Sequence, residues 1–159
     1  MPDGPMTPAT RALEGAGIPY RAHPYEHDPG ADGFGLEAAE VLGVEPERVF
    51  KTLLAEVDGE LVVGIVPVTS RLRLKSLAAA VGGTRASMAD PAVAERRTGY
   101  VVGGISPIGQ KRPHTTVVDE TAGLFDTVYV SGGRRGFDVE LAPADLVRLT
   151  GATLADIAR

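Results

Sequence analysis

The segment with the clearest potential for chemistry is an uncharged, glycine-rich stretch between two pairs of basic residues. It runs Thr98-Gly-Tyr-Val-Val-Gly-Gly-Ile-Ser-Pro-Ile-Gly-Gln110, with Arg96-Arg97 before it and Lys111-Arg112 after it. Glycine lets a main chain come close to a ligand and present its N–H groups, and the flanking cations suit phosphates. The pattern predicts a pocket for a small uncharged group that is attached to something anionic.

Pro107 argues against two catalytic interpretations of this segment. The stretch Gly104–Lys111 nearly matches a phosphate loop, but its lysine comes one position late and proline removes one amide from the cradle. Ser106 is a poor hydrolase nucleophile, because the next residue would have to supply an oxyanion N–H and proline has none. We therefore expect a turn at Ser106, with glycine amides still able to meet a ligand carbonyl.

Lys51 is the strongest single candidate for a catalytic side chain. Residues 49–57 are apolar and β-branched, which predicts a strand in which Lys51 shares a face with Val49, Leu53 and Ala55. A lysine in an apolar row is costly unless it opens into a cleft or finds a partner. The chain has three lysines against thirteen arginines, so a retained lysine suggests a site that needs a compact ammonium. A strand-edge lysine that reaches solvent explains the pattern equally well.

A metal site is not expected. His23, His27 and Asp28 lie close in sequence, but Pro24 opposes a helix that would place both imidazoles on one face. In a strand the two histidines would be about 13 Å apart, too far to share one ion. We expect neither a metal ion nor another cofactor.

Other polar candidates lie near turns. Tyr25 is in a polar loop and either shapes a turn or forms the rim of a pocket. Ser131 is followed by Gly132-Gly133, which is typical of a hairpin loop but can also present a hydroxyl and amides. Asp138 lies beside this loop and alternates with the apolar residues Phe137 and Val139. An ordinary exposed carboxylate on a strand has the same pattern.

Basic residues gather in four groups beside glycine turns. Such groups are usually solvated surface charge, but these could converge on one rim and contact phosphates. The groups are Arg71, Arg73 and Lys75; Arg96 and Arg97; Lys111 and Arg112; and Arg134 and Arg135.

Composition limits the classes of protein. The 159 residues suffice for one domain with a core, and no convincing domain boundary is seen. The chain has no cysteine, which excludes disulfides, thiolate metal sites and a cysteine nucleophile. The net charge of −5 opposes a dedicated nucleic-acid binder but permits a local basic rim. No apolar run approaches the ~20 residues of a membrane span, and no signal-peptide core is seen, so we expect a cytoplasmic protein.

The predicted elements indicate a mixed α/β fold. Strands over 49–57 and 61–68, joined by Asp58-Gly59, form a hairpin, and strands over 127–130 and 137–141 flank a long loop. Helices are expected over 36–42, 74–81, 91–98, 143–149 and 153–158. Because hairpins alternate with helices, we expect a mixed sheet, curled toward a barrel, with helices packed outside it.

Five segments occur in one order along the chain and together resemble the YbaK/EbsC family, specifically the YbaK-type aminoacyl-tRNA deacylases. The segments are Tyr25-Glu-His-Asp-Pro29, Val49-Phe-Lys-Thr-Leu-Leu54, Met88-Ala-Asp-Pro91, Thr98–Lys111 and Tyr129-Val-Ser-Gly-Gly-Arg-Arg-Gly136. The resemblance extends from about the first expected helix, over residues 7–15, to the end of the chain. It implies one domain over residues 1–159, with the curled α/β fold of the editing insertion in bacterial prolyl-tRNA synthetases.

The resemblance also implies an activity and its residues. The family clears Cys-tRNA(Pro), which prolyl-tRNA synthetase makes by mistake, and acts in trans with tRNA(Pro) and the synthetase as partners and no membrane. Its essential lysine corresponds to Lys51. The family's substrate-binding residues correspond to Tyr25, Gly103 with Gly104 beside it, Ser131 and Asp138.

Family chemistry uses the substrate as the nucleophile: the cysteinyl thiol attacks its own ester carbonyl and forms a thiolactone. That mechanism suits a chain with no cysteine and no usable serine elbow, since an intramolecular attack gains from proximity alone. Lys51 would then hold the tRNA 3′ end or the developing oxyanion. Two alternatives remain open, an editing deacylase that hydrolyses alanyl- or seryl-tRNA and a non-catalytic module that binds tRNA or synthetase.

Overall fold

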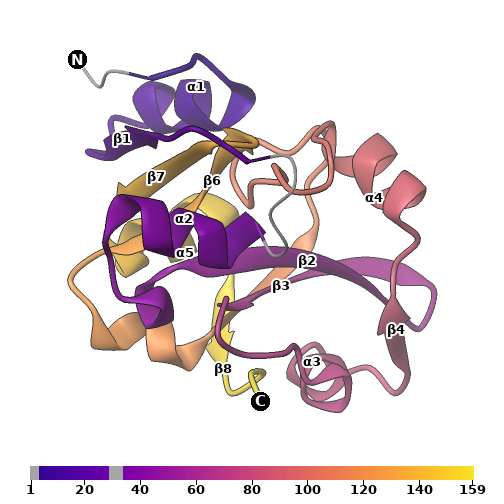
Figure 1. The fold of residues 1–159 in the computed structure, drawn as a ribbon. Helices are drawn as coiled ribbons and strands as arrows, with labels where there is room; N and C mark the ends of the chain where they lie inside the picture. The colour runs from indigo at the N-terminus through magenta and orange to yellow at the C-terminus, as the bar shows by residue number, and fades with distance from the viewer. Residues whose placement is uncertain (1–3, 29–33) are drawn as a thin grey trace.

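The computed structural model describes residues 4–28 and 34–159 (Figure 1). Pro29, which ends the Tyr25–Pro29 segment, lies outside the described residues. The helices of the described chain are α1 Pro8–Gly15, α2 Phe34–Leu42, α3 Leu74–Ala80, α4 Pro91–Thr98 and α5 Pro143–Thr150, with short 3-10 turns η1 Pro46–Arg48 and η2 Glu120–Leu124. The strands are β1 Arg21–Pro24, β2 Phe50–Val57, β3 Glu60–Pro67, β4 Ala86–Met88, β5 Thr115–Asp119, β6 Val128–Arg134, β7 Phe137–Leu141 and β8 Thr153–Ala155.

The strands form two sheets, and helices flank them (Figure 1). One sheet is antiparallel, in the order β1-β7-β6. The other has the order β4-β2-β3-β5-β8, with β2 antiparallel to its two neighbours and β5 parallel to β3 and β8. The predicted mixed α/β fold with flanking helices is therefore confirmed.

The prediction of one curled, barrel-like sheet needs correction. The two sheets meet at an isolated parallel bridge between Val49 and Tyr129. Beyond this bridge β2 and β6 diverge, and residues of both strands line a cavity instead of pairing. The chain thus leaves a space where continuous strand pairing would have closed the sheet.

Both predicted hairpins form, but the second differs in detail. Asp58 and Gly59 have positive φ values of 50° and 88°, as a tight β2–β3 turn requires. In the second hairpin β6 continues to Arg134, so Ser131 lies in a strand and not in the predicted long loop. The register shifts between Ser131 and Arg134, which allows the glycine pair to form a bulge within the strand.

The end of the chain was predicted as a helix and is instead a strand. Residues 153–155 form β8, which extends the larger sheet beside β5. The carboxylate of Asp119 accepts the N–H groups of Ile157 and Ala158, both at 3.0 Å, and so fixes the segment that follows. The short edge strand β4 was also not predicted.

The helix before the glycine segment has the expected ends. Asp90 caps α4 by accepting the N–H of Ala92 at 2.8 Å, and Gly99 ends it with a left-handed φ of 82°. The largest core cluster unites α1, β3, β7 and α5 through Leu13, Ile65, Phe137 and Leu146. No helix in residues 4–28 and 34–159 has the length and apolar character needed to cross a membrane.

Candidate active site

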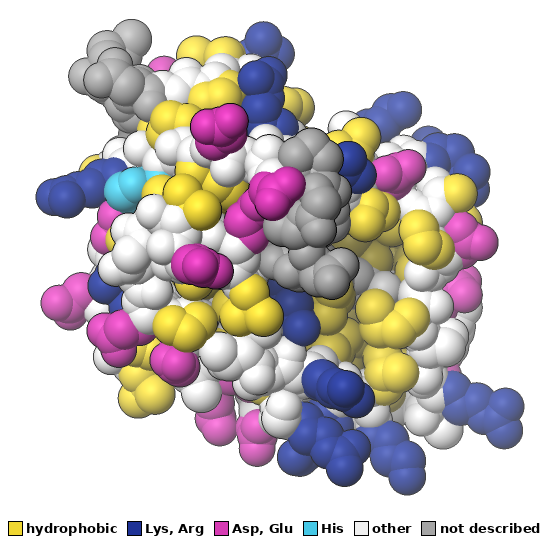
Figure 2. Space-filling view, viewed as in Figure 1, with side chains coloured by type: hydrophobic (Ala, Val, Ile, Leu, Met, Phe, Trp, Pro, Cys, Tyr) yellow, Lys and Arg dark blue, Asp and Glu magenta, His cyan; other side chains and the backbone are white. Residues whose placement is uncertain are grey.

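A cavity of about 430 Å³ opens where β2 diverges from the β6–β7 hairpin. Figure 2 shows a hollow lined by hydrophobic side chains, with Lys and Arg side chains gathered at its lower edge. Its polar side chains come from distant parts of the sequence: Tyr25, Lys51, Thr52, Ser131 and Asp138. The other lining residues are apolar or glycine. The structure thus brings together five residues singled out from the sequence, Tyr25, Lys51, Gly103, Ser131 and Asp138.

Lys51 lies half-buried on β2 and lines this cavity. Burial lowers the pKa of its ammonium, and the positive charge of Arg71 lowers it further. No carboxylate among the described residues forms an ion pair with it. An ammonium that has no ion-pair partner in the described part of the chain, at the wall of an apolar cavity, is available to an anionic or carbonyl group of a ligand.

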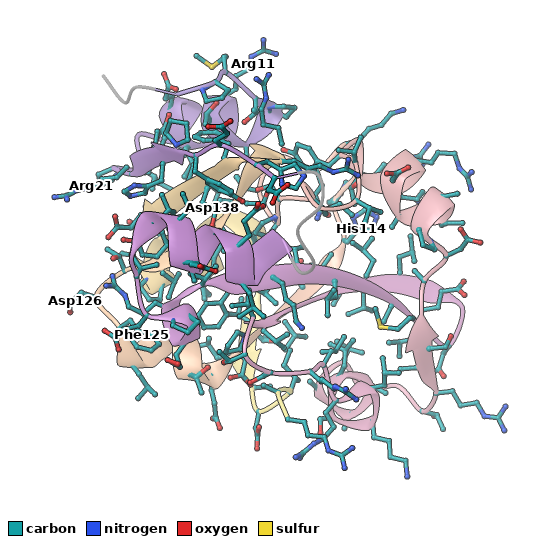
Figure 3. The ribbon with its side chains drawn as sticks, viewed as in Figure 1. Arg11, Arg21, His114, Phe125, Asp126 and Asp138 are labelled. Atoms are coloured by element: carbon teal, nitrogen blue, oxygen red, sulfur yellow. The ribbon has the colours of Figure 1, made fainter. Side chains whose placement is uncertain are left out.

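Asp138 is buried, with 6 % of its surface exposed. The interpretation of Asp138 as an ordinary exposed strand carboxylate is therefore wrong. Asp138 lies on β7 opposite Ser131 of β6 and His23 of β1. Figure 3 shows it inside the molecule, whereas Arg11, Arg21 and Asp126 lie at the periphery. Burial raises the pKa of its carboxyl to about 7, so a ligand charge can decide its protonation state.

Tyr25 follows β1, and its N–H donates to the carbonyl of Gly136 at 2.8 Å. Burial raises the pKa of its phenol, and the nearby carboxylates of Asp138 and Glu37 raise it further. Tyr25 is therefore a neutral hydroxyl beside Asp138 in the cavity wall.

The two N-terminal histidines have separate carboxylate partners. His23 contacts Glu140 at 2.8 Å, and His27 contacts Glu37 at 2.7 Å. Glu37 also accepts the N–H of Asp28 and so ties this segment to α2. In the described residues no three His, Asp or Glu side chains are grouped as a metal site.

The two adjacent glycines of the central segment have different positions. Gly103 lines the cavity and has a φ of 89°. Gly104 is not among the lining residues: its N–H donates to the carbonyl of Val101 at 2.9 Å, and a Cβ there would lie 2.8 Å from the main chain of Arg134 and Arg135. Gly104 thus allows the loop to pack against the β6–β7 turn.

Ser106 is buried in the turn that was expected there. Its hydroxyl accepts the N–H of Ile108 at 3.2 Å. It does not line the cavity, in keeping with its rejection as a nucleophile.

Sequence reasoning gave no role to Thr52, which also lines the cavity. Its Oγ1 is buried and has no hydrogen-bond partner among the described residues. A buried hydroxyl without a partner is costly. Its position next to Lys51 was the one signal in the sequence that could have identified it.

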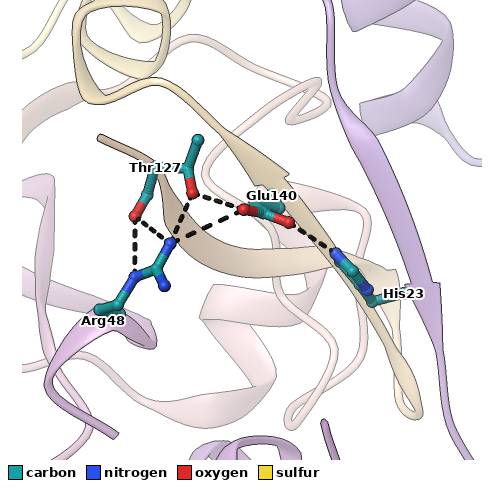
Figure 4. A network of polar contacts seen from close by, with 4 residues as sticks. All are labelled: His23, Arg48, Thr127 and Glu140. Atoms are coloured by element: carbon teal, nitrogen blue, oxygen red, sulfur yellow. Dashed lines mark hydrogen bonds and ion pairs between the residues drawn. The ribbon is translucent and has the colours of Figure 1, made fainter. Parts of the chain in front are cut away.

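A polar network next to the Val49–Tyr129 bridge connects the start of β2 to the smaller sheet (Figure 4). Arg48 of η1 donates to the carbonyl and hydroxyl of Thr127, and the Thr127 hydroxyl donates to Glu140. The Arg48 guanidinium also lies 5.3 Å from the ring centre of Tyr129. Because Arg48 lies just before β2 and Glu140 lies on β7, this network fixes the strand of Lys51 relative to the strand of Asp138.

Three comparisons relate the chain to known proteins. A family model described as the aminoacyl-tRNA editing domain matches residues 29–149. The Enterococcus faecalis protein EbsC, named as a Cys-tRNA(Pro)/Cys-tRNA(Cys) deacylase, is 38% identical over 95% of this chain and 92% of its own length. The Escherichia coli K12 protein ProXp-y, named a multifunctional Ser/Thr-tRNA deacylase, is 29% identical over 76% of this chain and 75% of its own.

A solved structure is also similar over nearly the whole chain. It is described as a trans-editing enzyme for prolyl-tRNA synthetase, and it superposes with a TM-score of 0.81 at 25% sequence identity. The match covers 98% of this chain and 99% of that one.

Proposed function

We propose that this chain, which belongs to the family of aminoacyl-tRNA editing domains, is a trans-editing deacylase that clears Cys-tRNA(Pro). The observation that carries the proposal is the charge pattern of the cavity. An apolar wall holds one ammonium, Lys51, and one buried carboxyl, Asp138. An aminoacyl ester has the complementary pattern, because its α-ammonium lies beside an ester carbonyl that is joined to an anionic nucleic acid.

Asp138 is suited to the α-ammonium of the substrate. A cation next to a buried carboxyl favours its ionised form, and with a pKa of about 7 this carboxyl ionises readily when the ammonium arrives. Tyr25 and Ser131 add neutral hydroxyls on the same wall. These groups hold the amino end of the ester.

Lys51 is suited to the opposite, ester end. Its ammonium stabilises the negative charge that develops on the carbonyl oxygen when the carbonyl carbon is attacked. Gly103 borders the same space without a side chain, so that the ester can approach the main chain closely.

The attacking group is the thiol of the bound cysteinyl residue. Its sulfur forms a bond to the ester carbonyl carbon, and the bond from that carbon to the ribose 3′ oxygen breaks. The proton lost by the thiol balances the proton gained by the 3′ oxygen, and the products are a four-membered thiolactone and uncharged tRNA. The protein contributes orientation and charge stabilisation and supplies no nucleophile.

The proposed partners are tRNA(Pro) and prolyl-tRNA synthetase. Support comes from the name of EbsC, which includes Cys-tRNA(Pro), and from the similar structure described as a trans-editing enzyme for that synthetase. The association with the synthetase is tested by cosedimentation of the two purified proteins with and without tRNA(Pro).

The test of the activity is deacylation of purified tRNA(Pro) charged with cysteine, serine, alanine or proline. We expect rapid loss of the cysteinyl ester, with a thiolactone trapped as the first product and Pro-tRNA(Pro) left intact. Release of free cysteine with no thiolactone would contradict cyclisation, and loss of none of the esters would contradict the activity itself.

A second candidate is hydrolysis of seryl- or threonyl-tRNA, the activity named for the E. coli relative. It requires attack by water, since a hydroxyl side chain is a weaker nucleophile than a thiol. The same panel separates the two candidates, because hydrolysis releases the free amino acid from Ser-tRNA.

A further inference from the structure

We infer that Arg71, Arg73 and Lys75, hereafter the basic ledge, form the surface along which the RNA backbone leaves the cavity. The inference rests on the proposed function and identifies which of the four basic groups in the sequence contacts the nucleic acid. Its partner is defined by chemistry: the phosphodiesters of an RNA strand whose aminoacylated end occupies the cavity.

Arg71 is the member of the basic ledge that charge and chain path place nearest to the cavity. Val68, which lines the cavity, donates its N–H to Val49 at 2.8 Å, and the chain then turns and reaches Arg71. The charge of Arg71 acts on Lys51, which places the guanidinium within electrostatic range of the cavity's ammonium. Figure 2 shows Lys and Arg side chains gathered beside the lower edge of the hollow.

The backbone that carries these cations is fixed. Leu72 forms an antiparallel bridge with Ala158, and Arg71 and Arg159 exchange main-chain hydrogen bonds at 3.1 and 2.9 Å. Arg73 donates to the carbonyl of Ile157 at 2.7 Å. Leu72 packs toward Gly64, so the neighbouring arginine side chains extend to the other side, into solvent.

The three cations of the basic ledge form no ion pair within the described chain. Arg71, Arg73 and Lys75 are exposed, and none of the ion pairs among residues 4–28 and 34–159 includes them. In a chain of net charge −5, three unpaired cations beside one opening create a local positive potential where the overall charge repels RNA.

Two of the other basic groups, Arg96-Arg97 and Lys111-Arg112, lie beside a different crevice. Arg97 and Arg112 are close enough to His114 that their charges, after burial, lower the pKa of its imidazole. Arg112 and His114 line a separate crevice that shares no lining residue with the Lys51 cavity. Arg135, in the fourth basic group, donates to the carbonyl of Val102 at the cavity and so has a partner within the chain. An RNA whose end occupies the cavity therefore meets the basic ledge before it meets Arg97 and Arg112.

The test measures binding of an uncharged RNA hairpin with a single-stranded 3′ CCA tail, by fluorescence anisotropy between 50 and 200 mM salt. Each phosphate contact contributes about 0.7–0.9 to the slope of log K against log salt. We expect the double variant R71Q/R73Q to lower that slope by about 1.5 and to weaken binding about tenfold per lost contact at 50 mM salt.

The matched control R11Q/R21Q removes the same charge from side chains that Figure 3 shows at the far edges of the molecule. It should keep the slope of the wild type. An unchanged slope in R71Q/R73Q, an equal loss in R11Q/R21Q, or a loss confined to R97Q/R112Q would each overturn the inference. R73Q/K75Q repeats the test without touching Arg71, and thermal melting confirms that each variant is folded.

Binding and deacylation, measured on the same proteins, report separately on the RNA surface and on the activity. If the wild type deacylates Cys-tRNA(Pro) while R71Q/R73Q keeps its binding slope, the surface is wrong and the activity stands. If the wild type deacylates nothing while its RNA binding depends on the basic ledge, the activity is wrong and the surface stands.

Discussion

Val49 and Tyr129 form an isolated parallel bridge between the two sheets, two residues before Lys51. Tyr129 is also two residues before Ser131, so the bridge lies at equal chain distance from two polar residues of the cavity wall. A parallel pair holds both strands in one direction and register. The separation of Lys51 from the β6–β7 wall is therefore set at this bridge and by the Arg48 network beside it.

Replacement of Arg48 by methionine should loosen this junction. The change removes the bonds to Thr127 and leaves the partly buried Glu140 with fewer donors, so the free energy of unfolding should fall by roughly 1–3 kcal/mol. Urea denaturation measures the loss. Arg148→Met is the control, because Arg148 pairs with Asp145 at the surface and should change stability by less than about 0.5 kcal/mol. Equal losses in both variants would show that the network has no special role.

Replacement of Lys51 by methionine should remove activity and leave the fold intact. Methionine keeps the apolar stem, and the lost ammonium is half-buried without a carboxylate partner, so the melting temperature should stay the same or rise. Single-turnover deacylation of Cys-tRNA(Pro) should slow by about 100-fold or more, as for the loss of an oxyanion-stabilising group. Lys111→Met, at an exposed site, is the control. Activity within a few-fold of wild type in Lys51→Met would exclude the lysine from the reaction.

The buried carboxyl of Asp138 should make stability depend on pH. Its pKa is raised to about 7 in the folded chain, from an ordinary value of 3.8, so the native state binds its proton more tightly than the unfolded state. The stabilisation is complete below pH 4 and is lost as the pH rises to about 7, with a slope of up to roughly 1.4 kcal/mol per pH unit. Denaturation of wild type and Asp138→Asn at pH 4 to 8 measures it. An equal slope in both proteins would contradict the assignment.

Loss of the Thr52 hydroxyl should not destabilise the fold. Its Oγ1 is buried and has no partner in the described chain, so Thr52→Val should keep or raise the free energy of unfolding, by up to about 1.5 kcal/mol. Because the buried oxygen is closed to a ligand as well as to water, deacylation of Cys-tRNA(Pro) should stay close to the wild-type rate. Urea denaturation and single-turnover deacylation measure the two effects. A destabilised Thr52→Val would indicate that the hydroxyl has a structural partner, and a large loss of activity would indicate a contact with the substrate.

The sequence predicted those elements whose signals are local. Asp58-Gly59 determined a tight turn, and Asp90 with Gly99 determined both ends of α4, because each signal acts within a few residues. Gly132-Gly133 misled for the same reason: a glycine pair is typical of a loop, whereas here Gly132 lies against the ring of Phe137 within a strand. The β8 strand depends on Asp119, more than thirty residues earlier, which no local pattern could reveal.

In the site, too, a residue with a local sequence signal could be predicted, and a residue whose environment comes from distant segments could not. Lys51 in its apolar row could be identified from strand periodicity, because an unpaired charge among apolar residues is conspicuous. Asp138 has the same periodicity as an exposed carboxylate, but in the fold it is buried and lies beside β1 and Tyr25, which come from the far end of the chain. The resemblance to the YbaK/EbsC family identified Asp138 as a site residue, whereas the pattern of residues along the strand could not have done so.

Replacement of Gly104 by alanine should disturb the cavity from outside it. A Cβ at this position would lie 2.8 Å from main-chain atoms of Arg134 and Arg135, which cannot move aside as a side chain can. The loop must therefore shift, and Gly103, which lines the cavity, must shift with it. We expect a loss of roughly 1–3 kcal/mol in the free energy of unfolding, together with slower deacylation. Gly15→Ala, at the end of α1 with nothing within 4 Å, is the matched control and should be neutral or stabilising by up to about 1 kcal/mol. Gly104→Ala with wild-type stability and activity would show that the loop can retreat from the β6–β7 turn without moving the cavity wall.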